Sequence, residues 1–183
     1  MITSVFNSTA IRKLSNGVSK TNVRNQGINL AQSNAGMHYF KQGHDAIIRK
    51  DWDSAIQYIK RALSVNSRNS EYLLVLSQVY YNKGVSEFAK GNWDSAINSY
   101  EKSIKINPND PECLFNLGLA YYQKGNAEFT KRNWNNAIYY YKASHDLNPT
   151  DQYVLHNLSA AYHNNGNTIE SEKYMKMYKA IIN

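Results

Sequence analysis

The sequence predicts an all-α protein in which about eight helices form a series of antiparallel hairpins. Its 183 residues include only three prolines and nine glycines, which favours long helices over many turns. The three tryptophans, Trp52, Trp93 and Trp134, recur every 41 residues. Each opens a similar phrase: DWDSAIQYIKRALSVN, NWDSAINSYEKSIKIN and NWNNAIYYYKASHDLN. Because self-similarity at a fixed period indicates stacked structural units, we expect one repeat array.

The segment that precedes each tryptophan reads as the first helix of a hairpin. In the third copy its apolar residues are Leu114, Leu117, Tyr121 and Phe129, which follow helical spacing. The repeats are expected at about 31–69, 70–110, 111–151 and 152–183. The last is shorter and is predicted to turn between residues 164 and 167.

The segment that each tryptophan opens reads as the second helix. Asp51, Asn92 and Asn133 precede the tryptophans and are suitable N-cap residues, whose side-chain oxygens can accept bonds from exposed backbone amides. The helices are predicted to end at Asn66-Ser67, Asn107-Pro108 and Asn148-Pro149, because proline disfavours helix in the residue before it.

Small residues recur seven apart on these second helices, where a large side chain would push neighbouring helix axes apart. The repeat signature consists of Trp52, Ala55, Ala62, Trp93, Ala96, Ser103, Pro108, Trp134, Ala137, Ser144 and Pro149.

With these residues in place, the chain resembles the tetratricopeptide repeat (TPR) family over about residues 31–183. KGNAEFTKRNWNNAIYYYKASHDLNPTD, residues 124–151, is close to a complete family signature. The resemblance implies a right-handed superhelical array of helical hairpins, a TPR-like α-solenoid. It implies a fold more strongly than a function, because one fold hosts many roles.

The period departs from the family value of about 34 residues. We place the surplus of seven residues in the first helix, where nearly two whole turns preserve the phase of the buried face. First helices of about 20 residues, roughly 30 Å long, are therefore expected. Each contains a glycine, Gly43, Gly84 or Gly125. The glycines indicate either close helix contact or a break in the helix.

Residues 1–30 lack sustained periodicity and read as a disordered basic arm. Arg12, Lys13, Lys20 and Arg24 give this segment +4 of the net +7, and no acidic residue precedes Asp45. Such an arm suggests an alternative role in binding anionic surfaces or nucleic acid. The charge is sparse for that purpose and disfavours such partners. Organelle targeting by the arm stays open.

No pattern of catalytic residues or metal ligands is evident, so we expect no enzyme activity, no metal and no cofactor. His156 and His163 are too far apart along a helix to share a metal ion. We expect all five histidines to be surface or groove residues. Cys113, the single cysteine, has no recognisable histidine partner and is expected to be inert. With no apolar run long enough to span a membrane, the expected location is cytoplasmic.

The family resemblance implies that the first helices line a concave groove in which partner segments bind. The groove residues it implies are Met37, Phe40, Lys41, Leu74, Gln78, Tyr81, Asn82, Leu119, Tyr122, Gln123, Asn126, His156, His163 and Asn164. Tyr81 and Tyr122 are the strongest candidates, because each follows another tyrosine and points about 100° away from it. The alternative is that these aromatics pack between hairpins.

The expected function is a scaffold that binds another protein or a peptide segment, with no small-molecule substrate. Phe40, Leu119 and Gln123 stand where a clamp for a terminal carboxylate would need basic residues. The resemblance therefore favours an extended, partly apolar ligand, docked through anchoring side chains. Self-assembly of the array into a homo-oligomer is the alternative.

Overall fold

The computed structural model describes residue 31 and residues 33–182 of the chain. Over this part it contains eight helices and no strand, as predicted. Residues 33–48 form the first helix. The others are α2 (Trp52–Val65), α3 (Ser70–Ala89), α4 (Trp93–Ile106), α5 (Pro111–Thr130), α6 (Trp134–Leu147), α7 (Gln152–Asn164) and α8 (Thr168–Ile182). The predicted basic arm, residues 1–30, lies outside the described residues. Its suggested roles in targeting and in binding anionic surfaces or nucleic acid therefore stay predictions.

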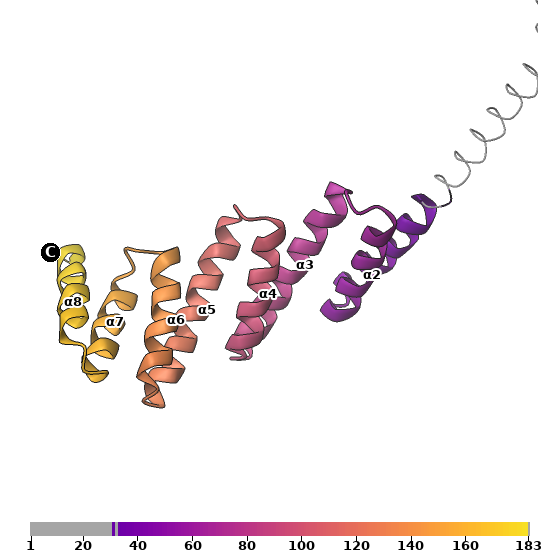
Figure 1. The fold of residues 1–183 in the computed structure, drawn as a ribbon. Helices are drawn as coiled ribbons and strands as arrows, with labels where there is room; N and C mark the ends of the chain where they lie inside the picture. Colours follow the sequence, from indigo (N-terminus) through magenta and orange to yellow (C-terminus); the bar gives the residue numbers. More distant parts are fainter. Residues whose placement is uncertain (1–30, 32, 183) are drawn as a thin grey trace, which may run out of the picture.

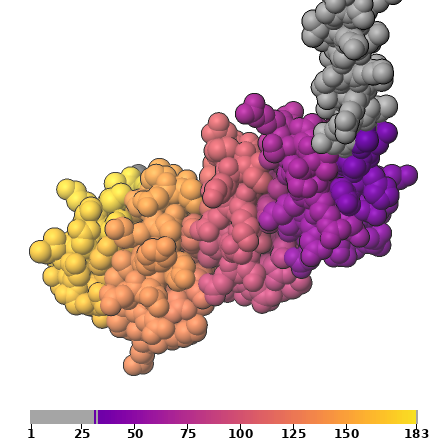
Figure 2. Space-filling model, turned by 45° about the vertical axis from the view of Figure 1, so that its right-hand side comes forward, coloured from indigo at the N-terminus to yellow at the C-terminus, as the bar shows by residue number. Residues whose placement is uncertain are grey.

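The helices pair as four successive hairpins that follow one another along an elongated array (Figure 1). Figure 2 shows neighbouring hairpins in contact along the whole array, from the indigo to the yellow end. Such an array buries its apolar faces only between neighbours, so stability depends on each hairpin and on each interface.

The first helices are long and continuous, because the inserted heptad extends them through their glycines. Helices α3 and α5 have 20 residues each, whereas α7, which lacks the insert, has 13. A Cβ atom on Gly84 would lie 2.5 Å from the Tyr100 ring, and one on Gly125 would lie 2.5 Å from the Tyr141 ring. Close helix contact, rather than a break, therefore explains these glycines.

The second helices begin where predicted, but two of the three predicted caps differ. The Asp51 carboxylate accepts a bond from the Ser54 amide at 3.2 Å. The side chains of Asn92 and Asn133 accept no bond from the helix. Their side-chain amide groups instead donate to Glu87 and Glu128 in the last turn of the preceding helix, so the expected N-cap bond is wrong at both positions. At the other end, the C-caps are Asn66, Asn107 and Asn148, as predicted.

Small residues make the close contacts within each hairpin. Ala55, Ala62, Ala96, Ser103, Ala137 and Ser144 are all buried. Ser77 and Ser103 exchange hydroxyl-to-carbonyl bonds of 3.1 and 2.9 Å across 26 residues. The short last hairpin repeats this exchange between Ser159 and Ser171, only 12 residues apart. The long hairpin and the short one therefore share this serine contact, and the long hairpin extends further past it toward the tip.

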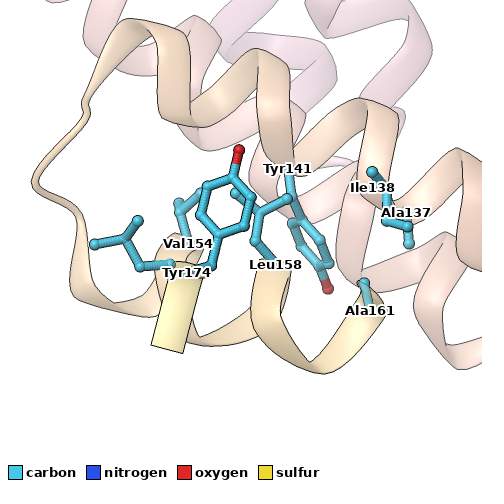
Figure 3. Packing of buried hydrophobic residues seen from close by; sticks show 8 residues of the cluster. Ala137, Ile138, Tyr141, Val154, Leu158, Ala161 and Tyr174 are labelled. Atoms are coloured by element: carbon cyan, nitrogen blue, oxygen red, sulfur yellow. The ribbon is translucent and has the colours of Figure 1, made fainter. Parts of the chain in front are cut away.

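The core runs between the hairpins rather than forming one central cluster. Figure 3 shows one section, in which side chains of α6, α7 and α8 interdigitate around Tyr141, Leu158 and Tyr174. The tryptophans that mark the period close the hairpin tips. Trp93 packs edge-on against Phe88, with ring centroids 5.0 Å apart, and the third copy repeats this contact. The small residues of the repeat signature thus lie in the interior of the array, whereas its prolines are exposed.

Candidate functional site

The first helices expose large apolar side chains that the core does not use. Met37, Leu74 and Phe115 are each about three-fifths exposed, at 61%, 60% and 61%. Sequence reasoning missed Phe115, although it stands 41 residues after Leu74 and the repeat period could have identified it. It also missed Tyr153, which is 64% exposed at the start of α7. These four side chains define the apolar part of what we call the first-helix face.

Tyr81 is half-buried between two hairpins instead of fully exposed. Its ring centroid lies 6.0 Å from that of Tyr100, and its hydroxyl accepts a 2.9 Å bond from the amide of Asn116 on the next first helix. Tyr122 and Asn157 repeat this bond at 3.2 Å, 41 residues later. Both tyrosines therefore serve the packing between hairpins, the alternative left open by the sequence. Each hydroxyl accepts this bond and can still donate its own hydrogen to another acceptor. Burial raises the pKa of Tyr81.

The first hairpin and the start of the second have apolar side chains where later hairpins make this polar contact. Phe40 and Val75 occupy the positions equivalent to Tyr81 and Asn116. The Phe40 ring stacks on Tyr72 with centroids 4.5 Å apart. The face therefore changes from apolar at its N-terminal end to hydroxyl- and amide-bearing further along.

Asn126 links its own hairpin to the next through its side-chain oxygen. Its Oδ1 atom accepts a 2.8 Å bond from the Tyr141 hydroxyl and a 3.0 Å bond from Asn157. Two weaker contacts join the remaining amides: Gln78 donates to Asn82 at 3.4 Å, and Asn126 donates to Gln123 at 3.5 Å. These bonds hold the polar part of the face in one arrangement.

The remaining predicted groove residues lie along the same helices. Lys41 is exposed and Leu119 is half-buried. His156 and His163 are exposed on α7, as expected, and the His156 ring lies 5.4 Å from the Tyr178 ring of α8. Asn164 donates back to its own helix, to the carbonyl of Ala160, at 2.8 Å.

Two pockets open between adjacent hairpins where the first helices begin. The first, about 380 Å³, lies between the first helix, α2 and α3. It is lined by Ser33, Gly36, Met37, Phe40, Val65, Asn66, Asn69, Glu71 and Tyr72. The second, about 280 Å³, lies between α5, α6 and the start of α7. It is lined by Pro111, Leu114, Phe115, Gly118, Leu119, Ser144, Leu147, Asn148 and Asp151. Gly36 and Gly118 occupy equivalent positions, two periods apart. The two pockets therefore lie at equivalent places in the first and third repeats.

The most perturbed carboxyl group lies at a hairpin tip, away from this face. Buried Glu128 accepts bonds from Asn133 at 2.9 Å and from Lys131 at 3.0 Å, and these bonds lower its pKa to about 2. Glu87 has the same pair of contacts one period earlier. Because the same contacts recur one period apart, we interpret the carboxylate at this position as structural: it joins the two helices of the hairpin at the tip.

Two further titratable side chains lie at least partly inside the array. Cys113 is fully buried, and burial raises the pKa of its thiol. His145 differs from the expectation of a surface or groove residue, because it is half-buried on α6, 5.7 Å from the Tyr174 ring of α8. Within the described residues, no cluster of three or more His, Cys, Asp or Glu could hold a metal ion. None of the described helices is long and apolar enough to cross a membrane.

The comparisons with known proteins agree with this architecture. The family model for the TPR repeat matches residues 86–125, which span the end of α3, α4 and most of α5. The TPR resemblance is thereby confirmed, and repeats of this type form scaffolds for protein interaction or self-assembly. No curated protein matches the chain.

Several solved structures match the chain at low identity and with low TM-scores. One crystal structure of MamA protein is 21% identical, covers 79% of this chain and 90% of its own, and gives a TM-score of 0.38. A second crystal structure of MamA, also 21% identical, covers 76% and 93%, with a TM-score of 0.40. MamA 41-end from Desulfovibrio magneticus RS-1 is 14% identical, covers 80% and 94%, and gives 0.33.

Proposed function

We propose that this repeat array is a scaffold whose first-helix face binds an extended, partly apolar segment of another protein. The observation that carries the proposal is the set of exposed apolar side chains, Met37, Leu74 and Phe115, on three successive first helices. Such side chains leave most of their apolar surface in water, and a partner that covers it gains apolar burial at about 25 cal/mol per Å².

The polar network beside these side chains supports the same proposal. Tyr81 and Tyr122 accept hydrogen bonds from side-chain amides of the next hairpin. Their own hydroxyl hydrogens are therefore positioned to be donated to the carbonyl groups of an extended chain. A face that is rigid before binding loses little conformational entropy on binding. The proposed ligand therefore has apolar anchors separated by backbone or polar groups.

The proposal is tested by affinity capture from a lysate of the source cell with a Leu74→Glu/Phe115→Glu double variant. Both side chains are largely exposed, so the variant is expected to fold, which circular dichroism checks. The matched control, Val85→Glu/Tyr139→Glu, adds the same charge at exposed positions that are not part of the first-helix face as defined. Proteins that the wild type and the control retain, and the double variant loses, support the face as the site. Identical sets from all three proteins refute it.

Self-assembly is the second candidate, favoured by the end of the array. Helix α8 exposes Ile169, Ile181 and Ile182, with 79%, 43% and 49% of their surfaces accessible. Static light scattering tests this candidate. A mass that rises with concentration in the wild type, and stays monomeric in an Ile169→Asp/Ile182→Asp variant, supports it. A mass that rises equally in both proteins places the contact elsewhere, and a constant monomer mass refutes it.

A further inference from the structure

The two pockets open at one edge of the array, which we call the joining edge. It is formed by the turns that connect each second helix to the next first helix, around residues 66–72, 105–113 and 145–153. The first helix also begins there, because Ser33 and Gly36 line the first pocket. The described part of the chain therefore begins at the joining edge.

The joining edge is acidic although the protein is basic. Its three turns contain five acidic residues, Glu71, Asp110, Glu112, Asp146 and Asp151. They contain two basic residues, Arg68 and Lys105, which leaves a formal net charge of −3 against +7 for the whole chain. An occupant of this edge gains most from positive charge, because opposite charges attract.

The second pocket offers an apolar floor for one large side chain. Leu114, Phe115, Leu119 and Leu147 contribute to its lining. Gly118 leaves space there, because an added Cβ atom would lie 3.7 Å from the nearest atom of Leu147, an ordinary van der Waals distance. The pocket therefore suits an aliphatic or aromatic side chain that is flanked by basic residues.

We infer that the chain's own residues 1–30 occupy the joining edge and place an apolar side chain in the pocket between α5, α6 and α7. This segment carries +4, precedes the first acidic residue of the chain, and includes Ile2, Val5, Phe6, Ile11 and Leu14. Thirty residues span up to about 100 Å when extended, so the segment can pass the first pocket and reach the second. In that position it covers Phe115 and Leu119 and competes with any partner for this part of the first-helix face.

Photo-crosslinking in the full-length protein tests the inference. The residue p-benzoylphenylalanine replaces Phe115, whose exposure makes the substitution tolerable. After irradiation at low protein concentration, mass spectrometry is expected to find residues 1–30 joined to position 115 in the monomer. The same photoreactive residue at Tyr139, which is exposed but outside the pocket, is the control. Absence of the link from position 115, or equal yields from both positions, overturns the inference. A link found only in dimers also overturns it and identifies a second copy as the source.

A pair of charge variants tests the electrostatic part. Glu71→Lys/Glu112→Lys reverses two exposed charges at the joining edge and is expected to lower the yield from position 115 several-fold. The matched control, Asp45→Lys/Glu172→Lys, changes the net charge equally at exposed sites outside that edge and is expected to leave the yield unchanged. Equal yields from the two variants overturn the role of the edge. The readout needs no external partner, so it is independent of the proposed scaffold function.

Discussion

Substitution of alanine at two glycines of the same helix separates the effect of close packing from helix propensity. Both Gly118 and Gly125 lie inside α5, so alanine at either removes the penalty of about 1 kcal/mol for glycine in a helix. At Gly125 the new Cβ atom would lie 2.5 Å from Cδ1 and 2.6 Å from Cε1 of Tyr141, a ring that is almost completely buried. The ring must move, at a cost of about 1–3 kcal/mol for overpacking.

Movement of that ring also threatens the bond between the Tyr141 hydroxyl and Asn126, worth about 0.5–1.5 kcal/mol. We therefore expect Gly125→Ala to lower the free energy of unfolding by about 1–3 kcal/mol, from the balance of these values. Gly118→Ala, whose Cβ atom meets only Leu147 at 3.7 Å, is expected to raise it by about 0.5–1 kcal/mol.

Urea denaturation followed by circular dichroism measures both effects, with thermal midpoints as a second measure because repeat arrays need not unfold in two states. Opposite shifts of the two midpoints support the packing argument. If Gly125→Ala is as stable as Gly118→Ala, the close approach of α5 and α6 does not determine the residue at this position, and the reasoning is refuted.

Three further predictions concern single polar side chains. Tyr81→Phe removes the acceptor of Asn116 and is expected to cost about 0.5–1.5 kcal/mol in urea denaturation; an unchanged midpoint would contradict the inter-hairpin bond. The fold lowers the pKa of Glu128 from 4.5 to about 2. Ionised Glu128 therefore stabilises the folded state above pH 4.5, and this contribution is lost as the pH falls toward about 2. Glu128→Gln should therefore be less stable than wild type near pH 7, and the gap should close near pH 2; a constant gap would refute this. Burial lowers the pKa of His145 below 6.5, so the unfolded chain binds its proton more tightly, and the contribution of His145 to stability declines as pH falls below 6.5. His145→Gln should flatten that decline, whereas His163→Gln at an exposed position should not; equal slopes in both variants would exclude His145 as the cause.

The fold was predictable because its determinants recur with the period. The tryptophans, the small residues of the second helices and the Asn-Pro ends each appear in successive copies, so one copy explains the others. The length of the first helices followed from a seven-residue surplus that preserves helical phase. Whether the helix breaks at Gly84 was not decidable from sequence. The residue that needs the space, Tyr100, lies on the other helix of the hairpin, and only the pairing of the two helices brings them together.

The candidate site was less predictable, because its polar groups choose between partners that sequence spacing cannot rank. Asn92 is of a residue type that favours the N-cap position. Its side-chain amide nevertheless donates to the carboxylate of Glu87, which is a strong acceptor because it is charged. Tyr81 has the spacing of an exposed residue, yet Asn116 from the following hairpin reaches its hydroxyl. Both outcomes depend on contacts between elements, whereas exposed Phe115 followed from the period alone and was overlooked.

The inserted heptad connects the fold to the proposed function. In the third repeat the extra turns include Lys124, Gly125 and Asn126. Lys124 pairs with Asp94 of the preceding hairpin at 2.7 Å, and Asn126 accepts a bond from Asn157 of the following one. The additional turns thus bond the third hairpin to both of its neighbours. A binding face built on such helices has little freedom to adapt, so affinity for a partner must come from the match between its anchors and fixed positions. Substitutions that loosen these links, rather than those on the face itself, are then expected to broaden the range of segments that the array accepts.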